Sequence, residues 1–362
     1  MKFGRDAARL KDVGMQVKAI PREEIDAWLL SEAGLPVRVV NAVRIVPVQT
    51  VGQLRKLPDS DLLKLRSLGR ISLGHIHSFL RHCGQIEQGR LRFASIQEVF
   101  ALVLDESERA VLTARYGLDL DPAKTGQARV TLQQIADTVQ ITRERVRQIQ
   151  DAGLLHLRSR LARACLQPFY EFLSAQLSRK GGIASREDLA ALRSEPALAG
   201  LNPCGLARLL SEANPAQLVT HHGFFTTFQK GFIEEVEARL VALLEEAGAP
   251  LTRDELCRKA GPEALGPLKD PAGAIECLLD HCPAVAAAKD GRYFLYRNGA
   301  QAFVVEILSR MERPAHYRKI TAAFNEALKP LKRKGAGFML GLLIATPRCT
   351  RVDRGIYDLK AE

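Results

Sequence analysis

The chain has 362 residues, of which 46% are hydrophobic and 26% are charged. This is the composition of a folded protein and excludes a largely disordered chain. Because domains usually contain roughly 100–200 residues, the length predicts several modules rather than one core. The formal net charge of +11 favours polyanionic partners, since lysine and arginine displace the counterions condensed on phosphates.

The distribution of apolar residues and cysteines predicts a cytoplasmic protein. The longest notable apolar run, residues 338–345, is far too short to span a bilayer, so we expect no membrane partner. The seven cysteines are scattered and form no C-x-x-C pair, which is typical of reduced thiols. The polar N-terminus also lacks the apolar core of a signal peptide.

The sequence contains no familiar catalytic motif. The phosphate-binding loop G-x-x-x-x-G-K-[ST], the elbow G-x-S-x-G and the zinc motif H-E-x-x-H are all missing, so we predict no enzymatic activity. Cys277, His281 and Cys282 lie close enough to suggest a metal. A structural zinc site needs four ligands, however, and no fourth residue stands in a convincing frame. We therefore predict no metal and no cofactor.

The N-terminal part of the chain is predicted to form short helices. Residues 1–30 are expected to be a helical segment, to which we assign no function. Residues 31–86 are expected to form a first module, in which Gly34, Pro58 and Gly69 mark the turns between helices. Residues 83–96 contain two glycines and are predicted to be a linker.

The segment 35–80 resembles the C-terminal domain of the RNA polymerase alpha subunit. The resemblance implies a helix-hairpin-helix fold that binds DNA. It places Arg38, Asn41, Gly69, Arg70 and Ser72 on the positions that contact DNA in that family. Gly69 would allow close backbone approach, the amides of the following helix would face phosphate, and Arg38 would enter a narrow minor groove.

Two positions depart from the pattern of that family, and the first of them predicts weaker phosphate affinity. Ile71 occupies a position that is basic in many members, and His75 replaces a commonly acidic residue that contacts partners. The alternative interpretation is a helical hairpin that docks a protein.

Residues 87–166 are predicted to contain a helix-turn-helix. Between 131 and 161, one apolar stripe is followed by a second, and Gln140-Ile141-Thr142 separates them. Thr131 and Gln134 have the spacing of a capping box, and Thr142 can cap the second helix. The exposed face of the second helix is expected to carry side chains that read base edges: Arg143, Glu144, Arg147 and Gln148.

Residues 97–166 resemble region 4 of the primary bacterial sigma factors. The resemblance rests on the sequence TLQQIADTVQITRERVRQI and on the preceding ERAVLTARYGLDL. It implies that the second helix reads the promoter −35 element through the four residues just named. It also implies contact with the RNA polymerase core, on which region 4 docks.

Residues 168–362 contain a threefold repeat. A proline stands eight residues before a glycine, and an aromatic follows two residues after that glycine, at Phe225, Tyr293 and Tyr357. Each unit predicts helices followed by a two-stranded hairpin, which is the outline of a winged helix. The predicted boundaries are 167–230, 231–298 and 299–362.

The last unit resembles the HARE-type winged helix. Its basic run includes Lys332, Arg333 and Lys334, which are expected to contact the phosphate backbone. Few basic residues stand near the hairpins of the first two units. We expect those two units to dock a protein partner or to act as spacers.

Together these features predict a mainly helical, multi-domain protein with helix-hairpin-helix, helix-turn-helix and tandem winged-helix modules and short β-hairpin wings. The predicted function is a transcription regulator of a bacterial-type cell that binds double-stranded DNA in the nucleoid. The alternative is a scaffold that binds DNA largely without regard to sequence, in a nucleoid or foreign-DNA defence assembly. Binding to random and to selected duplexes across salt distinguishes the two.

Overall fold

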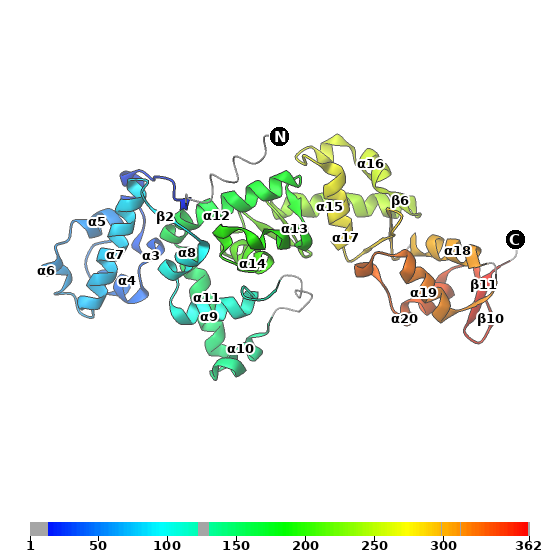
Figure 1. Ribbon diagram of the computed structural model, residues 1–362, viewed down its shortest axis with the longest axis horizontal. Helices are drawn as coiled ribbons and strands as arrows, with labels where there is room; N and C mark the ends of the chain where they lie inside the picture. Colours follow the sequence, from blue (N-terminus) through cyan, green and yellow to red (C-terminus); the bar gives the residue numbers. More distant parts are fainter. Residues whose placement is uncertain (1–13, 122–129, 298, 312, 361–362) are drawn as a thin grey trace. The chain divides into compact units, whose positions relative to one another are not determined.

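The computed structural model describes residues 14–121, 130–297, 299–311 and 313–360 (Figure 1). The chain is mainly helical, with small antiparallel sheets of two or three strands, which confirms the predicted fold class. It divides into two compact units, residues 1–175 with 186–218 and residues 176–185 with 219–362. The finer division into six segments remains a prediction. In the described ranges, each helix is too short or too polar to cross a bilayer.

The first unit begins with short helices that surround a longer one. They are α2 (Arg22–Asp26), α3 (Leu30–Ala33), α4 (Val37–Val43), α5 (Val51–Arg55), α6 (Asp59–Leu62) and α7 (Arg70–Glu87). Strand β1 (Met15–Gln16) pairs with β2 (Arg92–Phe93). The prediction of a linker over 83–96 is therefore wrong in part. Buried Cys83 and Ile86 keep α7 packed through its last turn, and Phe93 is buried in β2.

The second part of this unit contains the helix-turn-helix. Its helices are α8 (Ile96–Val103), α9 (Glu106–Tyr116), α10 (Leu132–Val139) and α11 (Arg143–Leu157). The predicted capping box at Thr131 and Gln134 is present. A second one starts α9 at Asp105 and Glu108. Each box satisfies amides that the helix start leaves unpaired.

Helices α9 and α11 approach each other closely. Gly153 lies inside α11, where glycine is unfavourable by about 1 kcal/mol relative to alanine. A Cβ at this position would stand 2.9 Å from Cδ1 of Leu112 in α9. Nearby, Nδ1 of His156 lies 2.9 Å from the carboxylate of Glu108, whose side chain is 4% exposed. Gly153 therefore lowers the helix propensity of α11 but allows α9 and α11 to pack closely.

The remaining elements repeat one order three times: helix, strand, helix, helix, strand, strand. The first set is α12 (Arg160–Arg179), β3 (Ile183–Ala184), α13 (Arg186–Ala190), α14 (Pro203–Ala213), β4 (Val219–His221) and β5 (Phe224–Thr226). The second is α15 (Lys230–Ala247), β6 (Leu251–Thr252), α16 (Arg253–Leu265), α17 (Pro271–His281), β7 (Val285–Ala287) and β8 (Arg292–Leu295). The third is α18 (Gly299–Met311), β9 (Ala315–His316), α19 (Tyr317–Ala327), α20 (Ala336–Ala345), β10 (Cys349–Asp353) and β11 (Ile356–Leu359). This is the element order of a winged helix.

The three sheets also share one topology. The last strand of each set lies between the other two, in the orders β3-β5-β4, β6-β8-β7 and β9-β11-β10. Phe225, Tyr293 and Tyr357 occupy that middle strand and are at most 5% exposed. The glycines two residues earlier all have positive φ, as tight hairpin turns require. The sequence repeat thus marks a buried middle strand and its turn.

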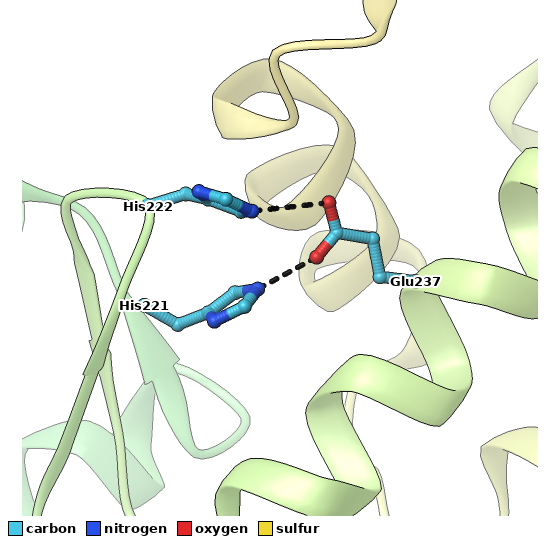
Figure 2. A group of neighbouring side chains, drawn as sticks. All are labelled: His221, His222 and Glu237. Atoms are coloured by element: carbon cyan, nitrogen blue, oxygen red, sulfur yellow. Dashed lines mark hydrogen bonds and ion pairs between the residues drawn. The ribbon is translucent and has the colours of Figure 1, made fainter.

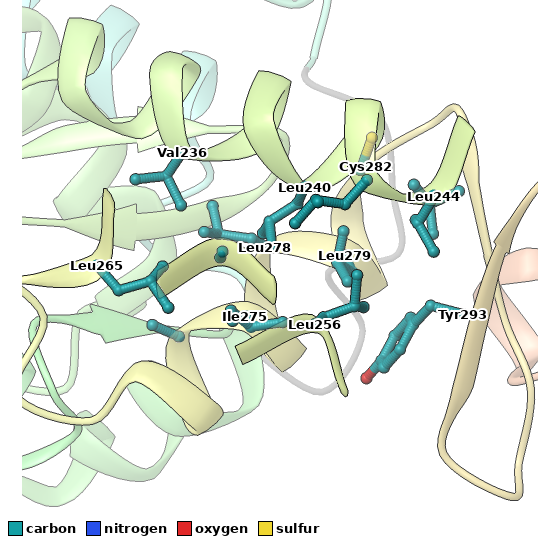
Figure 3. Packing of buried hydrophobic residues seen from close by; sticks show 14 of the residues in the cluster. Val236, Leu240, Leu244, Leu256, Leu265, Ile275, Leu278, Leu279, Cys282 and Tyr293 are labelled. Atoms are coloured by element: carbon teal, nitrogen blue, oxygen red, sulfur yellow. The ribbon is translucent and has the colours of Figure 1, made fainter. Parts of the chain in front are cut away.

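The cores of the second unit bury long apolar side chains from α15, α16, α17 and β8, some of which Figure 3 shows. Val236, Leu240 and Leu244 recur along one face of α15, at the spacing expected for a buried helical stripe. Between the second and third sets, the main chain of Lys289 bonds to Ala327 and that of Lys329 to Ala287.

The His156–Glu108 contact predicts a pH-dependent stability. The hydrogen bond to Glu108 raises the pKa of His156 above its ordinary value, although burial opposes the shift. Protonated His156 therefore stabilises the fold at pH values below its unfolded pKa, and that contribution is lost as pH rises through the raised pKa. A hydrogen bond to a charged group contributes about 1.5–3 kcal/mol. We expect His156→Gln to lower the free energy of unfolding more at pH 6 than at pH 9.

Urea unfolding of the full-length wild type and variant measures the loss of unfolding free energy at each pH, when it is monitored by a spectroscopic signal from the first unit. A loss of the same size at both pH values would contradict the assigned contact.

Candidate nucleic-acid interface

The second helix of the helix-turn-helix starts at a well-defined turn. Gln140 ends α10 in the left-handed conformation, with φ of 55°. Thr142 then caps α11, and its hydroxyl accepts a hydrogen bond from the amide of Arg145 at 3.1 Å. This confirms the predicted cap. Val146 and Ile149 are buried against the neighbouring helices, so the opposite face of α11 points outward.

The four predicted base-reading residues all lie on that outward face. The side chains of Arg143, Glu144, Arg147 and Gln148 are exposed, in the first two turns of α11. Arginine and glutamine can donate to purines, and glutamate can accept from cytosine. The surface thus carries the chemical groups that major-groove recognition needs.

Arg147 is bound by carboxylates of its own helix, one of which belongs to Glu144 of the same group. Its guanidinium contacts Glu144 at 2.7 Å and Asp151 at 2.6 Å. The hydrogen bond from Arg147 lowers the pKa of Glu144, and the same bond raises the pKa of Arg147. Both carboxylates are exposed, so water and salt weaken these pairs. Reading a base therefore requires Arg147 to exchange carboxylate partners for the base edge.

A match to a known protein family identifies the segment that carries this surface. Residues 102–159 match the family model for Sigma-70, region 4. The matched segment is a helix-turn-helix that binds DNA. It covers α9, α10 and α11. It also includes Arg143, Glu144, Arg147 and Gln148, the four residues of the outward face of α11, which we call the reading face. Neither the curated proteins nor the solved structures gave a match to this chain.

The region 4-like segment is stabilised by the ion pair and close packing of α9 and α11 described above. A cavity of about 200 Å³ lies beside it, lined among others by Phe100, Arg109 and Leu209. Its walls come from α8, α9 and α14, so it does not open onto the reading face of α11.

In the first module, most of the predicted contact residues lie at or next to the start of α7. Arg38 in α4 is exposed, and its Nε donates to the carbonyl of Ser67 at 3.2 Å. Gly69 is the N-cap residue of α7 and offers no side-chain cap. A Cβ there would meet no protein atom within 4 Å. The first amides of α7 are thus suited to an anion.

The remaining three residues of this module differ in exposure. Asn41 and Arg70 are exposed, but Ser72 is only 7% exposed. The prediction that the Ser72 side chain contacts DNA needs correction, because Ser72 faces the helical core. The neighbouring Ile71 is 80% exposed, next to the amides that would meet phosphate.

The basic run of the last repeat is largely used inside the protein. Lys332 is 6% exposed, and its Nζ donates to the carbonyl of Cys282. Burial lowers the pKa of Lys332 to about 8. Lys334 is half-buried, with Nζ 3.9 Å from the ring centre of Tyr296. The predicted phosphate contact of Lys332 is therefore wrong, because this residue joins the second and third repeats.

Arg333 alone of the three predicted residues in this run is exposed. Arg351 and Arg354 on the β10–β11 hairpin are exposed as well. These arginines keep a basic surface on the third repeat.

The sequence did not predict a group of three side chains in the second unit. His221 and His222 at the first hairpin meet Glu237 of α15, with all ligand atoms within 4.8 Å of one another. Adjacent histidines were the only signal, since Glu237 stands among other carboxylates of an amphipathic helix.

The burial of Lys332 predicts how substitutions will affect DNA binding. We expect Lys332→Met to leave the slope of log K against log salt unchanged, because its ammonium does not reach solvent. Arg333→Ala, one residue away, should reduce the magnitude of that slope by about 1 if it contacts a phosphate. Fluorescence anisotropy of a labelled duplex across salt measures both. A reduced slope for Lys332→Met would contradict the internal role of this lysine.

Proposed function

We propose that this protein regulates transcription by reading duplex DNA through α11, and that it acts by binding rather than by catalysis. The observation that carries the proposal is the outward face of α11 within the matched region 4-like segment. Its side chains combine donors and an acceptor on the first two helical turns, the part of a recognition helix that reaches base edges.

In addition to α11, two further surfaces support DNA binding. The start of α7 offers amides without a side-chain cap, next to exposed Arg38 and Arg70. We propose that it contacts phosphate and the minor groove. The third repeat adds Arg333 and the arginines of its hairpin. These contacts would position the protein without specifying sequence.

We also propose that the region 4-like segment contacts the RNA polymerase core, as its resemblance implies. The first two repeats are proposed to dock protein or to act as spacers. The charges at the second hairpin support this, since Arg292 is bound to Asp290 at 2.8 Å and to Glu306 at 3.0 Å. The side chain of Arg292 is only 26% exposed, against 52% for Arg147, so its carboxylate partners are less screened by water and it offers little to a phosphate.

Arg147→Ala tests sequence reading directly. After selection of a preferred duplex from a random pool, we expect the variant to lose about 10- to 100-fold in affinity for that duplex. Its affinity for random duplexes should change far less. Arg22→Ala is the matched control, because Arg22 is also an exposed arginine paired with an aspartate four residues away.

The pattern of losses separates the two functions considered. An equal loss on every duplex would show that Arg147 contacts only phosphate. Selection without any enriched sequence would favour the sequence-independent scaffold over a regulator.

A further inference from the structure

The hairpin of the first repeat brings two histidines to one half-buried carboxylate. His221 ends β4, and His222 follows it in the turn before β5. Figure 2 shows both imidazole rings pointing toward Glu237 of α15. Nε2 of His221 lies 2.6 Å from one carboxylate oxygen, and Nε2 of His222 lies 3.5 Å from the other.

We propose that His221, His222 and Glu237 bind one zinc ion. Two imidazole nitrogens and a carboxylate are a common set of three zinc ligands. At bond lengths of about 2.0–2.1 Å, the edges of a tetrahedral site are about 3.3 Å long. The nitrogen–oxygen spacings of 2.6 Å and 3.5 Å are close to this edge length, and a fourth position is left for water.

The surroundings suit a bound cation. The side chain of His221 is 9% exposed and that of Glu237 is 13% exposed, so neither ligand is well solvated. His222 is 37% exposed and gives access from solvent. The side chain of Cys282 lies next to Glu237, which is the place of an outer-shell partner of a zinc ligand.

The backbone of the hairpin supports a role for His222 beyond the turn itself. His222 has φ of 44°, a left-handed conformation that asparagine, aspartate or glycine usually occupies at this position of a two-residue hairpin turn. Together with Gly223 it closes a tight turn between paired His221 and Phe224. This conformation sets the centres of the two imidazole rings 4.1 Å apart, so that both rings can face one bound ion. A histidine is thus present where turn chemistry favours another residue.

A zinc ion here would tie the first hairpin to α15. Cys282, next to this carboxylate, also accepts a hydrogen bond at its carbonyl from Nζ of Lys332 in the third repeat. Zinc binding would therefore stabilise the packing of the first hairpin on α15 within the second unit. This role is independent of DNA reading by α11.

The test uses the untagged full chain, stripped with a chelator and dialysed against zinc. We expect one zinc ion per chain by atomic emission. His222→Asn should weaken zinc binding roughly 100-fold or more, since loss of an outer-shell partner alone costs 10- to 100-fold. Because asparagine favours this turn, the variant should melt no lower than wild type in chelator. Exposed His75→Ala is the control and should retain zinc.

Glu237→Gln adds a second ligand test. It keeps a similar shape and should also lose the zinc ion. The proposal is overturned if wild type retains no zinc above the buffer level, or if His222→Asn and wild type retain equal amounts.

Discussion

The packing of α11 against α9 is the constraint on which the reading surface depends. The helix can present its polar face only because its other side is fixed. Val146 is fully buried, Gly153 allows Leu112 to approach, and His156 binds the buried carboxylate of Glu108. Because Glu108 also closes the capping box of α9, one side chain both starts α9 and anchors α11.

The exposed face of α11 also contains ion pairs between its own side chains. Arg147 is bound by Glu144 and Asp151 on its own helix, so the free protein already satisfies its guanidinium. In the proposed recognition, a correct base would replace these bonds, whereas a wrong base would leave them lost without compensation. Such exchange favours discrimination between sequences over raw affinity.

Much of the fold was predictable from the sequence, because periodic patterns and turn residues report local structure. The capping box at Thr131, the cap at Thr142 and the three hairpin glycines all stand where the patterns indicated. The family match to residues 102–159 agrees with the resemblance read from the same residues.

The sequence could not predict which charges the tertiary structure uses internally. Lys332 and Arg333 are neighbours in a basic run, yet only Arg333 is exposed. Lys332 is buried because it contacts Cys282, which belongs to another repeat. The group of His221, His222 and Glu237 was missed for the same reason. Its members meet only when the first hairpin packs on α15.

The same limit applies to Ser72, whose burial depends on how α7 packs against the shorter helices around it. Exposure of a polar residue at a helix start cannot be read from spacing alone when the helix is covered on several sides. The first module therefore retains its backbone amides and arginines as candidate contacts, without the serine side chain.

Site-directed photocrosslinking tests the central claim most directly. A photoreactive residue at Gln148 of the full chain, mixed with the selected duplex, should crosslink to bases at one defined position. The same residue at Leu155, which is exposed farther along α11, should crosslink to bases much less. Crosslinking at Leu155 without any at Gln148, or no crosslink to DNA from either position while the duplex is bound, would contradict the account.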